Sequence, residues 1–534
     1  MQSAFVDVGD VTLHVRTAGS GIPMVLIHQA PISARTLESR IERLSADFFC
    51  IAPDLPGLGQ SDALGGGLVT VERMAKTIVG LLDRLGIEKA VFYGQHTGAL
   101  VATEIAASTP DKVAAVLIGG MPIYTAEESS QRVTSYAPPL AAPDWDGGHL
   151  SWLWYRYREQ FIYWPWNSKE PRIRATCAIP SKTFLHDGAG EIAARHASYA
   201  AVYHAAFDYD AEGVLNRVSV PMHFILDLAD SLSLKIELAA AANPALKRWP
   251  GATQDIEAIE RKVAIEAARG LKPQPPISTD ALSARRIARR WQGGAVDFWR
   301  VGKGGARPCL VLPPFPVGAR GVLPELESLP GRSFIIADLK ELPEAGGEAA
   351  WLDGLAAAIR EIAGDGPLDI AALGGACAVA AALAERLGAL VGNVTLVDRD
   401  DRGDGTPFDP TICAAGGHML RLWDRLRFER MRPPKATPDD PATARGRYES
   451  LDLLGRYSWD AVQNIERLPQ WDRLVAALEA TEEGFAQKPG VVTVVTGVDA
   501  RGSLPGNERA ARAAHQVRGI VDAPFAAALS LAGK

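Results

Sequence analysis

A sharp turn between a strand and a helix, with a histidine at its tip, is the feature of this chain that most restricts its fold. The apolar residues 90–93 predict a buried strand, and the run that starts at Ala99 predicts a helix. Between them, the sequence at 94–98 is Gly-Gln-His-Thr-Gly. A turn this tight leaves no room for side chains beside its tip, which explains the two glycines. The pattern predicts an α/β fold that presents His96 at the end of a strand.

The same alternation of strands and helices runs through the first 120 residues. The predicted strands are 11–19, 23–28, 48–54 and 113–120, and a helix is predicted near 71–85. Short buried strands that alternate with helices are typical of a mostly parallel sheet.

The sequence Asp-Leu-Pro-Gly-Leu-Gly-Gln-Ser-Asp at 54–62 begins at the end of one of these strands, about 40 residues before the His96 turn. These motifs, in this order, resemble the α/β-hydrolase superfamily, whose nucleophile elbow has the form G-x-S-x-G. The resemblance covers roughly residues 5–260. It implies a mostly parallel central sheet flanked by helices, with histidine in place of the usual serine. Because this fold supports many reactions, the resemblance is specific for fold and weak for chemistry.

The second half of the chain repeats the first. Residues 11–27 match residues 296–312, and residues 31–35 match residues 316–320. A third set of matches shares one constant offset. It pairs Gly147, Gly148, His149, Leu150, Trp154, Arg156, Arg158 and Pro165 with Gly416, Gly417, His418, Met419, Trp423, Arg425, Arg427 and Pro434. Matches of so many residue types at one offset predict a tandem duplication.

A chain of 534 residues is longer than a single hydrophobic core usually supports. We therefore expect two tandem α/β-hydrolase-like domains, each with a helical cap insertion. The expected domains are residues 1–263, with an aromatic-rich cap at about 121–217, and residues 293–534, with a cap at about 402–470. Pro-rich sequence after Lys272 and a basic stretch at 285–290 indicate a linker at 264–292.

The second copy has lost the residues that would support catalysis. Its strand-to-helix turn at 373–378 has the sequence Leu-Gly-Gly-Ala-Cys-Ala, which predicts Ala376 at the tip. Cys377 beside it is either a displaced nucleophile or, in the interpretation that we favour, a small residue packed under the helix. The second copy is therefore expected to be a scaffold, a dimer-like partner or a regulatory half.

The resemblance also implies which residues would assist His96. The family's acid follows a strand like that at 218–227, which places it at Asp230 here, with Asp227 as the weaker candidate. Asp230 could instead cap the next helix. The family's base histidine falls at Gln254, whose amide cannot take a proton at neutral pH. A conventional serine mechanism is excluded, because both the serine and its base are absent.

His96 could replace both missing groups. Imidazole is mostly neutral at pH 7, so it can attack a carbonyl as a nucleophile or act as a general base without an activating partner. Gln254 would orient the ring, and Asp230 would set its tautomer. The backbone amides of Thr97 and Ala30 would form the oxyanion hole, with Thr97 at a helix N-terminus. The alternative is that His96 only lines the pocket of a binding module.

The resemblance implies that the insertion at 121–217 forms a helical lid over the substrate pocket. Its many aromatic side chains predict an apolar or aromatic substrate. The expected substrate contacts are His28, Gln29, Trp152 and Trp154. His149 in the lid is a further catalytic candidate. Arg156 and Arg158 could hold a carboxylate, but the matching arginines of the second copy favour a structural role.

Composition narrows the possible partners. The formal charge of −7 and the lack of a long basic run argue against nucleic acid and anionic membranes. Five widely spaced cysteines without a CxxC pair, and histidines without HxH or HExxH grouping, predict no disulfide framework and no metal site, and no cofactor motif is present. No secretory signal and no long apolar run are visible, which predicts a cytoplasmic protein.

The sequence therefore predicts an atypical α/β-hydrolase-fold enzyme that acts on a small apolar or aromatic carbonyl substrate. The reaction would be cleavage of an ester, lactone, amide or C–C bond, with His96 as nucleophile or general base. Two alternatives stay open: a non-catalytic ligand-binding or interaction module, and a cofactor-free lyase, decarboxylase or oxygenase.

Overall fold

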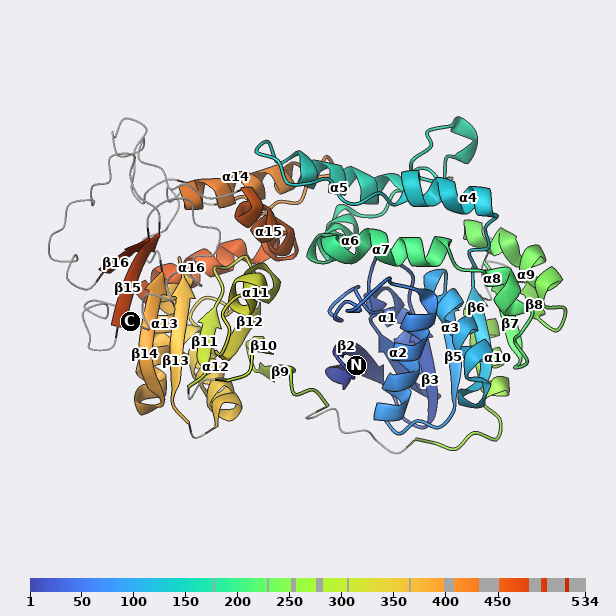
Figure 1. The fold of residues 1–534 in the computed structure, drawn as a ribbon, viewed down its shortest axis with the longest axis horizontal. Helices are drawn as coiled ribbons and strands as arrows, with labels where there is room; N and C mark the ends of the chain where they lie inside the picture. Colours follow the sequence, from blue (N-terminus) through green and yellow to red (C-terminus); the bar gives the residue numbers. More distant parts are fainter. Residues whose placement is uncertain are drawn as a thin grey trace. The chain divides into compact units, whose positions relative to one another are not determined.

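The chain forms two compact units in the computed structural model (Figure 1). The residues that the structure describes are 1–175, 178–227, 230–250, 256–274, 282–304, 307–364, 366–397, 408–431, 451–479, 491–496 and 514–517. Unit 1 comprises Met1–Leu140, Arg156–Pro180 and Arg195–Ala284, and unit 2 comprises Ala141–Tyr155, Ser181–Ala194 and Arg285–Lys534. The region expected to form the first cap, 121–217, is thus divided between the two units.

Unit 1 is built on an eight-stranded sheet with the order β1-β2-β4-β3-β5-β6-β7-β8. Its strands are β1 (Gln2–Val8), β2 (Val11–Ala18), β3 (Ile22–Ile27), β4 (Phe48–Pro53), β5 (Ala90–Gln95), β6 (Val113–Gly119), β7 (Met222–Leu226) and β8 (Lys247–Pro250). The pairs β1–β2 and β2–β4 are antiparallel, and the other pairs are parallel. Because parallel strands end at the same edge, the loops after β3, β5, β6 and β7 meet there.

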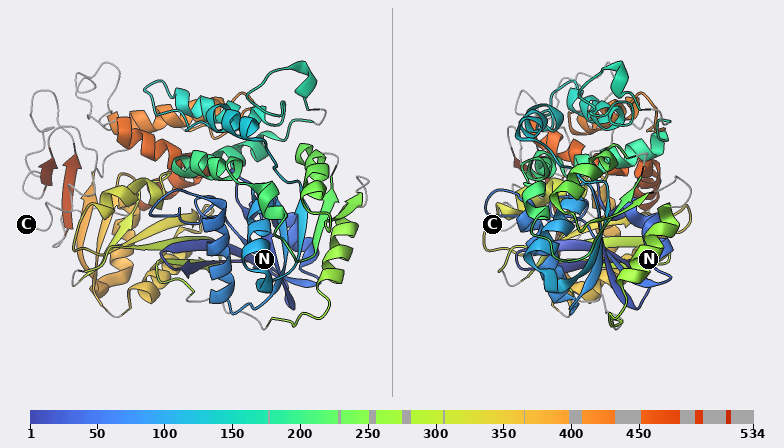
Figure 2. Two further views of the ribbon diagram at one scale, coloured as in Figure 1. Left: turned by 45° about the vertical axis from the view of Figure 1, so that its right-hand side comes forward. Right: turned by 90° about the vertical axis from the view of Figure 1, so that its right-hand side faces the viewer.

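Helices cover both faces of this sheet (Figure 2). The helices of unit 1 are α1 (Glu38–Leu44), α2 (Val71–Arg84), α3 (Thr97–Ser108), α4 (Ala126–Gln131), α7 (His196–Phe207), α8 (Ala211–Leu215), α9 (Ile236–Ala242) and α10 (Ile256–Ala267), with the end of α5 (Gly148–Glu159). α1 and α10 share one core cluster with the sheet, and α2 and α3 pack together on the opposite face. Burial on both faces explains why the parallel strands are nearly continuous apolar runs.

Unit 2 contains a second eight-stranded sheet, with the order β9-β10-β12-β11-β13-β14-β15-β16. This order repeats that of unit 1 strand for strand. The strands are β9 (Arg286–Trp291), β10 (Gly294–Val301), β11 (Cys309–Leu312), β12 (Phe334–Glu341), β13 (Leu368–Leu373), β14 (Val391–Val397), β15 (Val491–Thr496) and β16 (Ala514–Val517). Its helices are α6 (Lys182–Ala194), α11 (Ala319–Glu327), α12 (Glu348–Ala363), α13 (Ala376–Leu387), α14 (Gly417–Met431), α15 (Leu451–Ala461) and α16 (Leu468–Glu479), with the first part of α5.

The stretch 264–292, expected to be a linker, carries regular structure at both ends. α10 extends to Ala267, and residues 286–291 form β9, the edge strand of the second sheet. The arginines that suggested a linker have partners in unit 2: Arg286 lies over the Trp299 ring at 3.6 Å, and Arg289 pairs with Glu361. An edge strand accommodates charged side chains because one of its sides is unpaired, so the basic composition was a poor guide.

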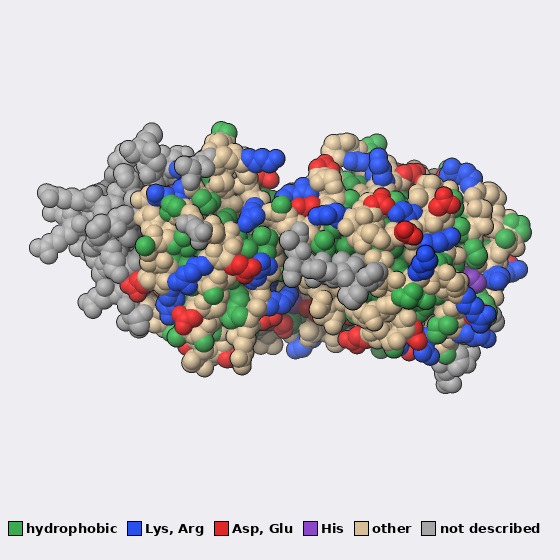
Figure 3. Space-filling model, turned by 90° about the horizontal axis from the view of Figure 1, so that it is seen from below, with side chains coloured by type: hydrophobic (Ala, Val, Ile, Leu, Met, Phe, Trp, Pro, Cys, Tyr) green, Lys and Arg blue, Asp and Glu red, His purple; other side chains and the backbone are tan. Residues whose placement is uncertain are grey.

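The surface carries charges of both signs. Figure 3 shows basic and acidic side chains mixed on the face that it draws. Within the described residues, no helix combines the length and the apolar character needed to cross a bilayer.

Candidate functional site

The predicted strand–turn–helix around His96 is present in unit 1. β5 ends at Gln95 and α3 begins at Thr97, so His96 alone makes the turn. Its φ of 51° and ψ of −113° lie where side chains are rarely tolerated, and it is the sole non-glycine with positive φ in the described part of the chain. Such strain costs on the order of 1–3 kcal/mol and persists where the surrounding structure imposes it.

The two glycines of the turn are required by close packing, as predicted. A Cβ on Gly94 would collide with the backbone of Gly98 and Ala99. A Cβ on Gly98 would collide with the carbonyl groups of Ile27 and His28, which end the neighbouring strand β3. Helix α3 therefore starts directly against the sheet, and the His96 side chain is held at the edge where the strand ends meet.

His96 is hydrogen-bonded to Asp230. Its Nε2 lies 2.7 Å from Oδ2 of Asp230, which follows β7. The other oxygen of Asp230 accepts a hydrogen bond from the backbone N–H of Leu232 at 2.9 Å, so this carboxylate also caps the short helix Ser231–Lys235. The two roles expected as alternatives, partner of His96 and helix cap, are carried by different oxygens of one residue. The His96 side chain is 24% exposed and that of Asp230 is 11% exposed.

This contact fixes which ring nitrogen can act as a base. A carboxylate only accepts hydrogen bonds, so Nε2 of His96 carries the proton and donates it to Asp230. Nδ1 then holds a lone pair, and it has no hydrogen-bond partner within the described residues. A neutral, partly exposed imidazole oriented by a carboxylate can take a proton from a substrate or from water.

Gly120, which was not among the predicted site residues, makes room for the His96–Asp230 pair. It follows β6 with a φ of +71°, and its carbonyl accepts a hydrogen bond from the His96 backbone N–H at 3.0 Å. A Cβ on Gly120 would collide with Oδ2 of Asp230 and would lie 3.0 Å from the His96 ring. The Gly-Gly sequence after β6 is the signal from which it could have been identified.

The two residues predicted to supply the oxyanion amides, Ala30 and Thr97, are in contact. The backbone N–H of Ala30 faces the Thr97 hydroxyl, at a long distance of 3.4 Å. Both residues are buried. A substrate oxygen bound here would replace this weak hydrogen bond with a stronger one to the Ala30 amide. The buried Oε1 of Gln29, one residue before Ala30, has no partner among the described residues, which leaves it available to a ligand donor.

His28 is structural, which corrects the expectation that it contacts substrate. Its ring is fully buried, Nδ1 donates to the Gln29 carbonyl at 2.8 Å, and Nε2 accepts from the Leu55 N–H at 2.9 Å. Burial lowers the pKa of His28, which keeps it neutral as this hydrogen-bond pattern requires. The ring joins the ends of β3 and β4 and leaves no nitrogen for a ligand.

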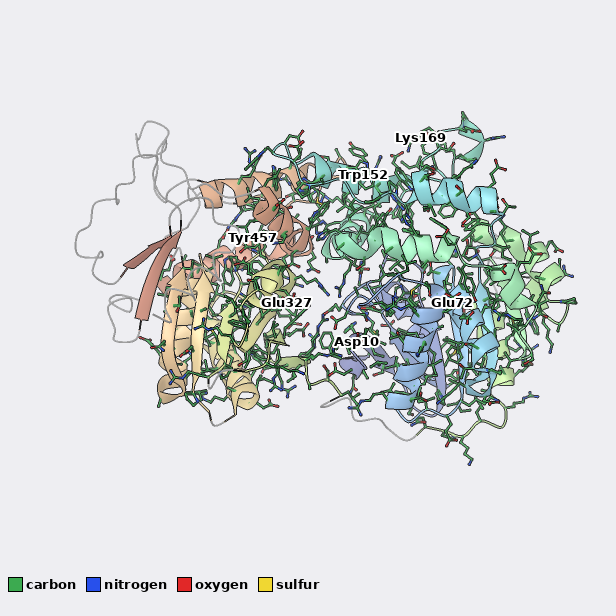
Figure 4. All side chains as sticks on the ribbon, viewed as in Figure 1. Asp10, Glu72, Trp152, Lys169, Glu327 and Tyr457 are labelled. Atoms are coloured by element: carbon green, nitrogen blue, oxygen red, sulfur yellow. The ribbon has the colours of Figure 1, made fainter. Side chains whose placement is uncertain are left out.

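His149 and Trp154 are also structural, again contrary to expectation. Both belong to unit 2, as does half-buried Trp152 (labelled in Figure 4), whereas His96 belongs to unit 1. Both nitrogens of buried His149 are occupied: Nδ1 accepts from the Asp144 N–H at 3.4 Å, and Nε2 donates to the Ser458 hydroxyl at 3.0 Å. A role for Trp152 in substrate binding stays a prediction.

Reciprocal contacts within unit 2 explain why the matched motifs are present in both copies. The Trp154 ring packs on His418 with centroids 4.8 Å apart, and the Trp423 ring packs on His149 at 4.9 Å. Each indole N–H donates to a backbone carbonyl of the other segment, at 3.1 and 3.0 Å. The histidine and tryptophan of one segment thus contact the tryptophan and histidine of the other, as equivalent residues do in an isologous interface.

The remaining predicted residues are placed as follows. Gln254 lies outside the described residues. Asp227 directly follows β7, and its backbone N–H donates to the Ser233 hydroxyl at 3.2 Å. Of the two candidates for the acid, it is Asp230 whose carboxylate contacts the His96 ring.

The turn of the second copy differs from its prediction by two residues. Gly374 follows β13 and has a φ of +60°, whereas Ala376 is the first residue of α13. The N–H of Cys377 donates to the Gly374 carbonyl, as that of Ala99 donates to the His96 carbonyl. The residue equivalent to His96 is therefore Gly374. Cys377 is buried, with its thiol 3.5 Å from two backbone carbonyls, which fits the packing role that we favoured.

Glycine at position 96 is expected to make the protein more stable than alanine does. Both replacements remove the imidazole, but only glycine adopts a φ of 51° without strain. We expect the free energy of unfolding of His96→Gly to exceed that of His96→Ala by about 1 kcal/mol, measured by urea denaturation. Within α3, where φ is negative, Ala106→Gly should instead destabilise. An equal stability of the two His96 variants would show that the turn relaxes without cost.

Unit 2 is expected to lose stability as the pH falls below about 6.5. Burial lowers the pKa of His149 to about 4, and burial, with a smaller contribution from His186, lowers the pKa of His418 to about 3. Below pH 6.5 the unfolded chain binds protons at both rings and the folded chain does not. The free energy of unfolding is therefore highest above pH 6.5 and falls as the pH approaches the folded-state pKa values. Each ring should account for a loss on the order of 2 kcal/mol between pH 7 and 5. His149→Gln should reduce this slope in urea unfolding; an unchanged slope in His149→Gln would contradict the assignment.

Comparison with known proteins agrees with this geometry. Residues 22–152 match the family model described as alpha/beta hydrolase fold. A putative non-heme haloperoxidase of Mycobacterium phage D29 is 38% identical over 105 residues, which is 20% of this chain and 37% of that protein. An epoxide hydrolase of Caballeronia sordidicola is 34% identical over 122 residues, 22% of this chain and 37% of that protein. Haloalkane dehalogenase 2 of Mycobacterium tuberculosis H37Rv is 26% identical over 142 residues, 26% of this chain and 50% of that protein.

These matches span half or less of the length of the curated relatives. Among solved structures, epoxide hydrolase A from Mycobacterium thermoresistibile covers 52% of this chain and 99% of its own, with a TM-score of 0.40 and 22% identity. The chain thus has an α/β fold and resembles the α/β-hydrolase superfamily.

Proposed function

We propose that this chain is an enzyme in which His96, oriented by Asp230, acts as a general base on a small apolar or aromatic carbonyl substrate. The observation that carries the proposal is the 2.7 Å contact between Nε2 of His96 and Oδ2 of Asp230. It leaves Nδ1 with a lone pair at a partly exposed elbow. The reaction would be cleavage of an ester, lactone, amide or C–C bond.

A base fits this geometry better than a nucleophile. The nitrogen with the lone pair is Nδ1, which adjoins the ring carbon that carries the rest of the side chain. Attack on a carbonyl carbon from this position is crowded, whereas a proton of water or substrate can approach. A water that loses its proton to Nδ1 would attack the carbonyl, and Asp230 would stabilise the imidazolium that forms. The amides of Ala30 and Thr97 would bind the developing oxyanion.

The contrast between the two copies supports catalysis over a pure binding role. The equivalent turn of the second copy has Gly374, which adopts positive φ freely. The first copy instead keeps a strained histidine that contacts a carboxylate. Strain held at one position of a fold is common at functional sites. The identical strand orders and the reciprocal contacts in unit 2 support our further proposal that the two sheets arose by duplication and that the second copy is a scaffold.

A panel of aryl esters, lactones, anilides and β-diketones tests this function. The wild type is expected to turn over at least one class, His96→Ala to lose that turnover, and His96→Ser to fail to restore it, because no described residue would activate the serine. If the wild type turns over no member of the panel and His96→Ala binds the same compounds equally well, the binding-module alternative is correct.

A further inference from the structure

Helix α5 carries a buried arginine whose charge is not neutralised by any described carboxylate. Arg156 is 1% exposed. Its Nε donates to the Tyr199 hydroxyl at 2.6 Å, Nη2 to the Tyr203 hydroxyl at 3.4 Å, and Nη1 to Oε1 of Gln160 at 3.3 Å. All of these residues belong to unit 1. The three acceptors are neutral, so they satisfy hydrogen bonds but supply no counter-charge.

Aromatic rings surround the same guanidinium. Its carbon lies 4.6 Å from the Trp166 ring centre, 5.2 Å from Tyr136, 5.6 Å from Tyr199 and 5.8 Å from Tyr203. Burial raises the pKa of the three tyrosines, so their hydroxyls stay protonated at neutral pH. Cation–π contacts reduce the cost of burying the charge. A buried charge without an opposite charge remains expensive.

The matching arginine of the second copy has the carboxylate that Arg156 lacks. Arg425 forms two hydrogen bonds to Asp472, at 2.8 and 2.6 Å. The acid three residues after Arg156 on the helix, Glu159, instead contacts Arg158 at 3.4 Å and Lys169 at 2.5 Å. The match between Arg156 and Arg425 favoured a structural role for both, but the two arginines do not have the same kind of partner. Arg425, which has a carboxylate partner, belongs to the copy whose turn lacks histidine. Arg156, which has none among the described residues, belongs to the copy that contains His96.

Arg156 is connected to the candidate site through Tyr203. The hydroxyl that accepts from Nη2 also lies 3.5 Å from the Ala30 carbonyl, to which it donates. Ala30 carries the proposed oxyanion amide, and that amide faces Thr97 beside His96. Each terminal nitrogen of the guanidinium makes one recorded hydrogen bond and has two N–H groups, so one N–H of each is left for a further acceptor.

We propose that Arg156 binds a carboxylate of the substrate. The preferred substrates would then be small aromatic or apolar carbonyl compounds that also carry a free carboxylate. A guanidinium binds the two oxygens of a carboxylate through parallel hydrogen bonds, and both are strengthened in a site lined by rings. The predicted preference for substrates with a carboxylate rests on the proposed function. The predicted binding of a carboxylate by Arg156 does not.

Binding is tested by calorimetry with phenylacetate and with 2-phenylethanol, a neutral analogue that has no ester bond to cleave. Wild type should bind phenylacetate at least about tenfold more tightly than 2-phenylethanol. Arg156→Gln should lose this preference, and Arg156→Lys, which keeps the charge without the planar fork, should retain part of it. Arg158→Gln, a change of the neighbouring arginine that pairs with Glu159, and His96→Ala should both keep wild-type preference.

Equal affinity of the wild type for phenylacetate and 2-phenylethanol would overturn the proposal, and this comparison needs no variant to fold. Wild-type phenylacetate affinity in a folded Arg156→Gln protein would overturn it as well.

Turnover is compared with 4-nitrophenyl hydrogen succinate and its neutral 4-nitrophenyl methyl succinate counterpart. We expect kcat/KM of the wild type to be at least about tenfold higher for the acid. If neither ester is hydrolysed but Arg156-dependent phenylacetate binding holds, the proposed function fails and the carboxylate site stands. If His96 hydrolyses both equally and phenylacetate is not preferred, the carboxylate site fails and the function stands.

Discussion

Replacement of Asp230 by asparagine is expected to lower kcat by about 10²–10⁴-fold with little change in stability. One oxygen of Asp230 accepts from the Leu232 N–H, so the single carbonyl oxygen of asparagine would be held there. Its NH₂ group would then face Nε2 of His96, which must become the acceptor. The ring proton would move to Nδ1, and the nitrogen that should take a proton would already carry one. The measurement is steady-state kinetics on whichever substrate class the wild type cleaves.

Asp227→Asn is the matched control, because this residue lies on the same loop and was the weaker candidate for the acid. It should keep kcat within a few fold, since the recorded partner of His96 is Asp230. A kcat for Asp230→Asn close to that of the wild type would mean that the carboxylate does not set the tautomer used in catalysis.

Replacement of Asp54 by alanine is expected to destabilise the protein by about 3–5 kcal/mol. This carboxylate is fully buried directly after β4 and contacts Arg16 at 3.0 Å and His14 at 2.9 Å. It also accepts from the backbone N–H groups of Ala34 and Gln60, both at 2.9 Å. Burial alone would raise the pKa of Asp54, but Arg16 and His14 outweigh burial and hold the pKa well below its usual range. Its removal takes this acceptor from half-buried Arg16, which keeps its contact with Glu38, and leaves buried His14 and two backbone donors without it.

Glu38→Gln provides the comparison for Asp54→Ala. Glu38 is the second partner of Arg16, at 3.1 Å, but its side chain is 38% exposed. Its loss should cost under about 1 kcal/mol, because exposed ion pairs contribute little. Urea unfolding of both variants measures the difference; similar effects of the two changes would show that burial of Asp54 is not what makes its contacts strong. Because Ala34 lies in the loop that also carries Ala30, loss of Asp54 should reduce turnover as well.

The local features of the candidate site were predictable from sequence because short-range sterics determine them. The glycines at 94 and 98 can serve only a tight approach of helix to sheet. Asp230 was located by the resemblance to the α/β-hydrolase superfamily, whose acid follows the corresponding strand. The error of two residues in the second copy arose because Gly374 and Gly375 both suit the turn. The positive φ of Gly374 and the hydrogen bond to its carbonyl identify it as the tip.

Features that depend on distant partners could not be predicted. His149 was assigned to the candidate site because it lies in the expected cap, yet its partner Ser458 lies 309 positions away. The absence of a carboxylate beside Arg156 was invisible for the same reason: its counterpart Arg425 looks identical in sequence until Asp472 is placed beside it. A motif shared by two copies indicates shared packing only where the partners are shared too.

The central claim is that Asp230 holds the proton of His96 on Nε2 and leaves Nδ1 as the base. Long-range ¹H–¹⁵N NMR of protein labelled with ¹⁵N only at its ten histidines measures which ring nitrogen carries the proton, and it needs no substrate. The signal of His96 is assigned by its loss in His96→Ala. The prediction is that the Nε2–H tautomer of His96 is populated in the wild type and the Nδ1–H tautomer in Asp230→Asn. A wild-type ring protonated at Nδ1, or a tautomer unchanged by Asp230→Asn, would contradict it.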